Sequence, residues 1–146
     1  MFGYLKLRWK LWKLRRVWDL TDEANTSRKE EAKKQKAPRD QLREIEQDGV
    51  LDYFEYQDSV RAAHTKYLLM TASQLIVPIP SPEEKAMWEE SHAGRRDLTE
   101  LGINTVRAAV RAERKARLEM FLMWVPGVVG ILGALIGLVS VFFGKK

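Results

Sequence analysis

The chain has 146 residues, of which 31% are charged, with a formal net charge of +5 and no cysteine. The absence of cysteine excludes disulfide bonds and thiolate metal sites, and it agrees with a reducing compartment. Without its most apolar segment, the chain has the length of one domain. Its charge is uneven, because residues 1–17 contain six bases and no acid. Such a local excess of positive charge suits an anionic surface, either lipid head groups or nucleic acid.

Residues 1–20 have the pattern of a basic amphipathic helix. Apolar residues recur there at spacings of three and four, which places them on one stripe of a helix. The alternation from Leu5 to Leu11 also fits a short strand, but it fails at Trp12 while the helical spacing continues. The stripe consists of Tyr4, Leu7, Leu11, Leu14 and Trp18. The residues that we expect at a membrane surface are Lys6, Arg8, Trp9, Lys10, Trp12, Lys13, Arg15 and Arg16.

This N-terminal segment has several interpretations. A helix with bases on one side and Leu and Trp on the other can lie in the interface of a bilayer, with its bases near anionic lipid. An apolar stripe is also the usual sign of packing against other helices. Bases among aromatic residues occur in proteins that bind single-stranded nucleic acid, and a basic, acid-poor N-terminus is typical of transit peptides. We expect the lipid bilayer, with anionic lipids, as the partner, and we do not expect nucleic acid.

The sequence pattern in the middle of the chain predicts helices, which we expect to lie in the cytoplasm. Residues 21–38 are polar and predict a charged helical extension or linker, which ends at Pro38. We expect residues 39–118 to form an antiparallel helical hairpin. Its first helix has apolar residues at near-heptad spacing, as in a coiled coil, and prolines then predict a turn near residues 75–82.

The second arm of this predicted hairpin begins with a helix-start signal. A capping Ser81 is followed by Pro82 and by Glu84, and this spacing predicts a helix from Pro82 to about Gly94. A break follows, and the helix restarts at Thr99. No stop signal separates that last helix from the apolar segment beyond it, so we expect one continuous helix that enters the membrane.

The segment from Met120 to Phe143 is 24 residues long and contains no charged side chain. About 20 apolar helical residues cross a hydrocarbon core of roughly 30 Å, so we expect a transmembrane helix at residues 120–143. The alternative is a core helix of a soluble protein, but a helix that is apolar on every face needs a larger surrounding domain. Residues 144–146 form a short basic tail.

The residues that flank this span and the glycines within it lead to two further expectations, one on topology and one on self-association. Lysine and arginine are retained on the cytoplasmic side, so the bases before the span predict a cytoplasmic N-terminus and an outside C-terminus. Small residues inside a span let two helices approach closely, which predicts a homo-oligomer. The topology residues are Arg111, Arg114, Lys115 and Arg117. The helix-association residues are Gly130, Gly133, Ala134, Gly137 and Ser140.

The last third of the chain resembles the ending of small, uncharacterised bacterial single-span membrane proteins. The resemblance covers residues 97–140, where an LTxxG start leads through a basic helix into a glycine-rich span. It implies a location in the bacterial inner membrane and implies no activity.

The sequence contains no catalytic constellation. His64 and His92 are isolated, and there is no P-loop, GxGxxG, GxSxG or HExxH spacing. We therefore expect no enzyme activity, no cofactor and no metal. The expected function is that of a membrane-anchored scaffold or binding protein, which presents its helical hairpin to an unidentified protein partner. The alternative is a small membrane-active protein, a holin-like or toxin-like pore former.

Overall fold

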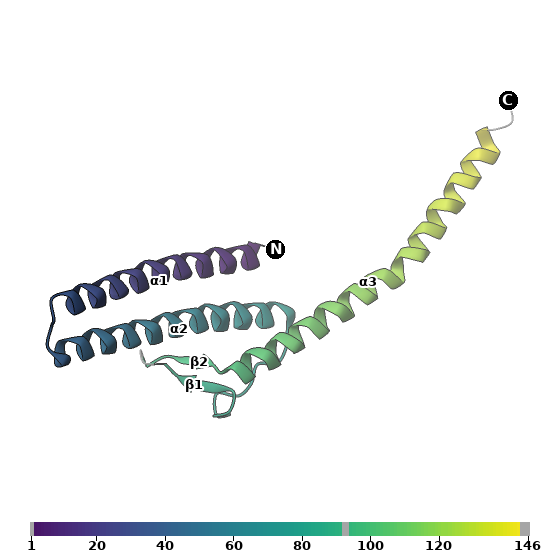
Figure 1. Cartoon of the computed structure of the whole chain (residues 1–146). Coiled ribbons are helices and arrows are strands. Elements are labelled where there is room, and N and C mark those ends of the chain that lie inside the picture. Colours follow the sequence, from purple (N-terminus) through teal and green to yellow (C-terminus); the bar gives the residue numbers. More distant parts are fainter. Residues whose placement is uncertain (1, 92–93, 144–146) are drawn as a thin grey trace.

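The computed structural model describes residues 2–91 and 94–143, and within them the chain forms three helices and one two-stranded sheet (Figure 1). His92 and the basic tail at 144–146 lie outside the described residues. The predictions of an all-α architecture with a helical hairpin and a long apolar C-terminal helix are confirmed. In chain order the elements are α1 (Phe2–Lys34), α2 (Arg39–Leu75), β1 (Trp88–Glu90), β2 (Arg96–Leu98) and α3 (Glu100–Phe143).

The hairpin is formed by α1 and α2, which lie antiparallel along their length (Figure 1). The residues predicted as an amphipathic helix and as a charged extension form one helix, because α1 continues to Lys34. The apolar stripe of α1 faces α2, and polar pairs replace it toward the connecting turn. Contacts along the pair join Tyr4 to Tyr67, Trp18 to Tyr53 and Tyr56, Asn25 to Asp52, and Lys29 to Glu46.

Both helices of the hairpin end in a left-handed residue. Lys36 has φ of 54° after α1, and Ile76 has φ of 59° after α2. The backbone N–H of the residue after Ile76 donates to the Ala72 carbonyl (2.9 Å), which satisfies a carbonyl that the helix leaves unpaired. Glycine usually occupies this position, because a β-branched side chain is strained there.

The prediction of a helix from Pro82 to about Gly94 is wrong. The Glu83 N–H donates to the Ser81 hydroxyl (3.3 Å), as a cap would require, but the chain then forms only turns. Beyond the turns β1 pairs with β2 in antiparallel register, with Trp88 opposite Leu98. An ion pair between Arg61 of α2 and Glu89 of β1 ties this small sheet to α2.

The β-hairpin returns the chain to the middle of α2, so α3 does not run back along α2. The Leu98 N–H donates to Thr65 Oγ1 (3.0 Å), and further along both helices Arg117 Nη2 donates to the Leu75 carbonyl (2.9 Å). These two contacts advance in the same sense along both helices, so α2 and α3 run in the same general direction where they touch. The members of the helical hairpin therefore differ from the prediction, which paired α2 with residues 82–118.

The buried core lies where α2, β2 and the start of α3 meet. Its shape requires glycine at one position, because a Cβ at Gly102 would clash with the Met87 carbonyl oxygen. Beyond this junction α3 leaves the hairpin and projects away from it (Figure 1). The core residues are Leu68, Ala72, Val77, Leu98, Val106 and Val110.

Candidate membrane-interaction site

The C-terminal part of α3 is long and apolar enough to cross a bilayer, and it is the one such helix among the described residues. In its most apolar stretch of 18 residues, no residue is buried against the rest of the described chain. That exposure contradicts the alternative of a core helix packed within this chain. Large apolar side chains that face outward here include Phe121, Leu122, Met123, Trp124, Ile131, Leu132, Leu135 and Ile136.

The outer face of α1 presents aromatic and basic side chains together. Trp9 is 60% exposed and Trp12 is 55% exposed. Lys13 Nζ lies 3.7 Å from the centroid of the Trp9 ring, and the Arg16 guanidinium carbon lies 5.5 Å from that of Trp12. All eight residues predicted for a membrane surface, from Lys6 to Arg16, are exposed. Indole rings beside ammonium and guanidinium groups suit a lipid head-group layer.

The inner face of α1 packs against α2. Leu7 is only 9% exposed, and Leu11, Leu14 and Trp18 are partly buried. The Trp18 ring stacks on that of Tyr56 at a centroid distance of 5.3 Å. In the sequence, packing on other helices and exposure at a membrane surface were alternative interpretations of this segment. The structure places them on opposite faces of one helix, so packing of the stripe leaves Trp9, Trp12 and the bases free.

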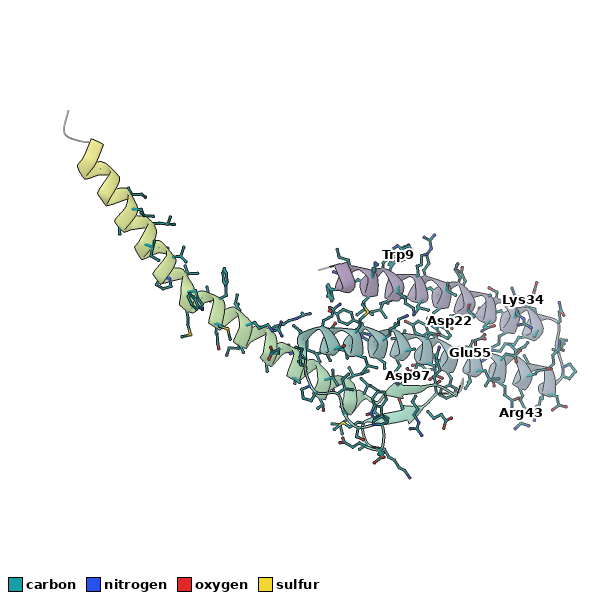
Figure 2. All side chains as sticks on the ribbon, turned by 180° about the vertical axis from the view of Figure 1, so that it is seen from behind. Trp9, Asp22, Lys34, Arg43, Glu55 and Asp97 are labelled. Atoms are coloured by element: carbon teal, nitrogen blue, oxygen red, sulfur yellow. The ribbon has the colours of Figure 1, made fainter. Side chains whose placement is uncertain are left out.

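The outer face of α1 is turned toward the end of the fold where the apolar helix projects. In Figure 2 Trp9 projects from the side of α1 that lies away from α2. The C-terminal half of α3 rises past the same side of the hairpin in both Figure 1 and Figure 2. A bilayer around that half of α3 would therefore meet α1 before α2.

The N-terminal end of α1 lies close to the start of the apolar segment. Gly3, Tyr4 and Leu5 line a cavity of about 750 Å³ together with Arg114 of α3. Arg114 precedes Met120 by six residues, which corresponds to about 9 Å of helix. The interfacial layer of a bilayer is about 5 to 8 Å thick on each side of the hydrocarbon core. These lengths are similar, so a bilayer that α3 crossed at residues 120–143 would have its head groups close to the start of α1.

The predicted topology residues have different surroundings in the structure. Arg111 and Arg114 line a groove between α1, α2 and α3. Lys115 Nζ lies 3.7 Å from a Glu119 carboxylate oxygen within α3. Arg117 does more than the sequence indicated, because it holds the C-terminal carbonyl of α2 in addition to its ion pair with Glu113 (2.7 Å). A basic side chain near a helix C-terminus stabilises the helix dipole.

The predicted helix-association residues lie on a part of α3 that does not pack on the other described elements. A Cβ placed on Gly130, Gly133 or Gly137 would have no atom within 4 Å outside its own helix. Ala134 is exposed, and the Ser140 hydroxyl donates to the Ile136 carbonyl of the preceding turn (2.9 Å). The stripe is therefore open to another helix.

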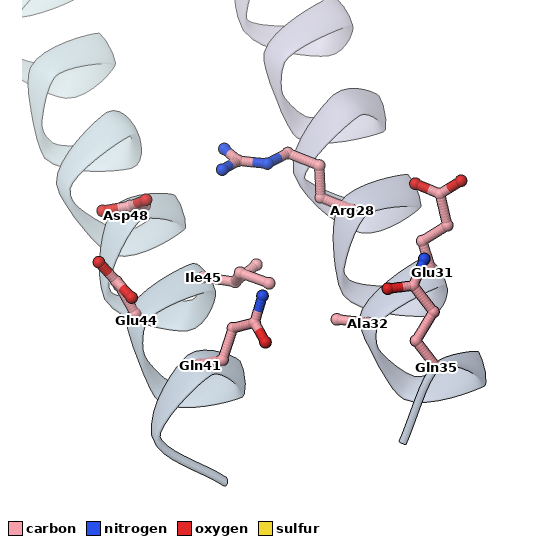
Figure 3. A pocket seen from close by; sticks show the side chains of 8 residues that line it. All are labelled: Arg28, Glu31, Ala32, Gln35, Gln41, Glu44, Ile45 and Asp48. Atoms are coloured by element: carbon pink, nitrogen blue, oxygen red, sulfur yellow. The ribbon is translucent and has the colours of Figure 1, made fainter. Parts of the chain in front are cut away.

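The far end of the hairpin has a different character. A polar cavity of about 310 Å³ lies between α1 and α2 near their connecting turn, and in Figure 3 Arg28 reaches from α1 toward α2. Its other lining residues are Glu31, Ala32, Gln35, Gln41, Glu44, Ile45 and Asp48. No group of three metal-ligating side chains occurs in the part of the chain that the structure describes.

His64 is the histidine that the structure describes, and it lies half-buried on α2. Burial lowers the pKa of His64, and the positive charge of Arg107 lowers it further. The imidazole is therefore neutral at pH 7, and it adds polarity without charge to the groove between the three helices.

Comparison with known proteins gives no relative from which a site could be transferred. No family model matches the chain, and no match was found among curated proteins or solved structures.

Proposed function

We propose that this protein is a non-enzymatic membrane-anchored scaffold, with α3 as its single span and the N-terminal part of α1 at the bilayer surface. The observation that carries the proposal is the two-faced packing of α1. Its inner stripe is fixed on α2, while Trp9, Trp12 and five bases that do not line the groove between the helices, Lys6, Lys10, Lys13, Arg15 and Arg16, stay exposed. The N-terminal end of the same helix lies beside Arg114 of α3. Each base near an anionic surface contributes on the order of 1 kcal/mol, so this face adds several kcal/mol to attachment.

The charge of the hairpin supports an orientation with its turn away from the bilayer. Residues 1–17 contain six bases and no acid, whereas residues 40–58 of α2 contain seven acids and one base. Anionic lipid attracts the first group and repels the second. The acidic part of α2 is then presented to the cytoplasm, where it fits a protein partner with a basic surface.

We further propose a cytoplasmic N-terminus, an outside C-terminus and a bacterial inner membrane as the location. The bases at 107–117 support this orientation, because such residues are retained on the cytoplasmic side. A reporter that works only in the cytoplasm should be active when it is fused before Met1. A reporter that works only outside the cytoplasm should be active when it is fused after Lys146. A C-terminal reporter that is active in the cytoplasm would refute the orientation.

Chemical footprinting of lysines tests the position of α1 in the full-length protein. In bilayers with anionic lipid, Lys6, Lys10 and Lys13 are expected to react more slowly with an amine-modifying reagent than in neutral bilayers. The protection should fall as salt rises, since added ions screen the attraction. Lys33 and Lys34, at the far end of the same helix, serve as the internal control. If Lys6, Lys10 and Lys13 reacted as fast as Lys33 and Lys34 in both kinds of bilayer, the position of the N-terminal part of α1 at the surface would be refuted.

The open glycine stripe of the span favours self-association, and with it a second candidate function as a pore former. Replacement of Gly133 and Gly137 by leucine should weaken association between spans, because bulky side chains hold the backbones apart. Leakage of a dye from vesicles separates the two functions. A pore former releases the dye and loses this activity with the leucine variant, whereas a scaffold leaves the vesicles intact.

A further inference from the structure

Four arginines converge on a groove at the junction of the three helices. Arg8 comes from α1, and Arg107, Arg111 and Arg114 come from α3. The groove has a volume of about 610 Å³, and none of its lining residues is acidic. No carboxylate in residues 2–91 and 94–143 forms an ion pair with any of these four side chains. The cluster is therefore an uncompensated positive site.

The other residues that line the groove are mostly apolar or aromatic. The rest of the lining comes mainly from the packed faces of the helices, and it continues through Tyr4 and Tyr67 into the neighbouring cavity of about 750 Å³. That second cavity has no acidic lining residue either. A ligand that suits both parts has an anionic group at one end and an apolar chain at the other. The apolar residues of the lining are Leu7, Leu11, Leu68 and Val110.

The position of the groove selects the source of such a ligand. Arg114 lines the end of the groove nearest the apolar segment and stands about 9 Å of helix before it, at head-group depth if α3 spans the bilayer. Phospholipids are present there at high concentration, and guanidinium groups bind phosphate oxygens through two parallel hydrogen bonds. We infer that the groove between α1, α2 and α3 is a binding site for one anionic phospholipid, whose phosphate group is held by Arg8, Arg107, Arg111 and Arg114. This inference rests on the proposed membrane location of α3.

The site differs from the outer face of α1 in what it recognises. The outer face attracts any anionic surface through charges that move freely, so its binding has no fixed stoichiometry. The groove has walls from three elements and a limited volume, so it should hold one lipid molecule and retain it in neutral detergent. A bound phosphate would also hold α1 to α3 at the point where the hairpin meets the span.

Native mass spectrometry of the full-length protein in neutral detergent tests the inference. The probes are phosphatidylglycerol, phosphatidylcholine with the same acyl chains, and glycerol phosphate without chains. We expect one phosphatidylglycerol per chain, with weaker binding of both other probes. The variant Arg111→Gln/Arg114→Gln should bind phosphatidylglycerol roughly 10- to 30-fold more weakly, since each base near the lipid contributes up to about a fivefold step.

Two matched variants separate the groove from bulk charge and from folding. Lys66→Gln/Arg95→Gln removes two exposed bases outside the groove and should leave the single lipid in place. Arg111→Lys/Arg114→Lys keeps the charge but loses the paired hydrogen bonds, so its affinity should lie between those of the native protein and the glutamine variant. Helix content by circular dichroism should stay unchanged in every variant.

Three outcomes overturn the inference. They are equal binding of the two phospholipids, equal loss of lipid in the Lys66→Gln/Arg95→Gln variant, and glycerol phosphate binding as tightly as the intact lipid. Sedimentation with vesicles separates these from failure of the proposed function. A chain that stays in the vesicles but shows one of those outcomes refutes the lipid site alone, and a chain that does not enter vesicles refutes the membrane anchor itself.

Discussion

The packing of α1 on α2 can be tested at Leu7, which is 9% exposed on the inner face of α1. Leu7→Ala removes three carbons, and burial of one methylene group contributes about 0.8 kcal/mol. The transfer cost is therefore about 2 kcal/mol. Leu7 borders an open groove, so little additional cavity is formed and the cost falls at the lower end of the usual range of about 2 to 5 kcal/mol.

Urea unfolding of the full-length protein in neutral detergent, followed by near-ultraviolet circular dichroism of the stacked rings of Trp18 and Tyr56, measures this cost. With a slope of about 1 to 2 kcal/mol per molar, the midpoint should fall by roughly 1 to 2 M. Leu20→Ala is the matched control, because Leu20 lies on the same helix and is 61% exposed. It should change the stability by less than about 1 kcal/mol. Equal losses for both variants would show that α1 does not pack on α2 through its stripe.

Three further substitutions are expected to change stability in the same unfolding assay. Ile76→Gly should stabilise the hairpin by up to about 1 kcal/mol, because Ile76 holds φ of 59° with an exposed β-branched side chain; a loss of stability would contradict this strain. Gly102→Ala should lower the free energy of unfolding by about 1 to 3 kcal/mol, because its Cβ clashes with the Met87 carbonyl oxygen. An unchanged midpoint would contradict the close packing of the segment before β1 on the start of α3. Because burial and a neighbouring arginine lower the pKa of His64, the unfolded chain binds more protons below about pH 6.5, so stability should fall as the pH drops from there toward the lowered pKa of the folded state. His64→Gln should remove part of that acid sensitivity, and an identical pH profile for the variant would contradict the neutral, half-buried imidazole.

The sequence was sufficient for the features that depend on local pattern. The apolar segment after residue 120 and the three-four stripe of α1 are strong periodic signals, and the structure forms a helix at both. The signals at Ser81 and Pro82 were also local, but there the helix fails. The start pattern is followed by no sustained apolar face, and Trp88 instead pairs in β1 and packs against the core.

The pairing of the helices could not be derived from periodicity alone. A stripe indicates that a face is buried but does not identify the element that covers it. The prediction paired α2 with the residues after the prolines because short connections favour neighbours. The β-hairpin lengthens that connection, and the shorter turn at 35–38 makes α1 the antiparallel neighbour instead.

The groove was missed because its arginines come from distant parts of the sequence. Arg8 and Arg111 were assigned to a surface helix and to topology, and no spacing rule connects residues about 100 positions apart. One signal was present. Arg107, Arg111 and Arg114 follow a helical spacing of four and three, which indicates a basic stripe on one face of a helix.

The depth of α1 in a bilayer tests the central claim most directly, and the absence of cysteine allows one spin label at each chosen position. Trp12→Cys, Ile131→Cys and Glu44→Cys report on the outer face of α1, the span and the far part of α2. In bilayers with anionic lipid, collisions with oxygen and with a water-soluble nickel chelate should place the label at 131 in the hydrocarbon, the label at 12 at the head groups and the label at 44 in water. A label at 12 that meets the nickel chelate as often as the label at 44 would contradict the account.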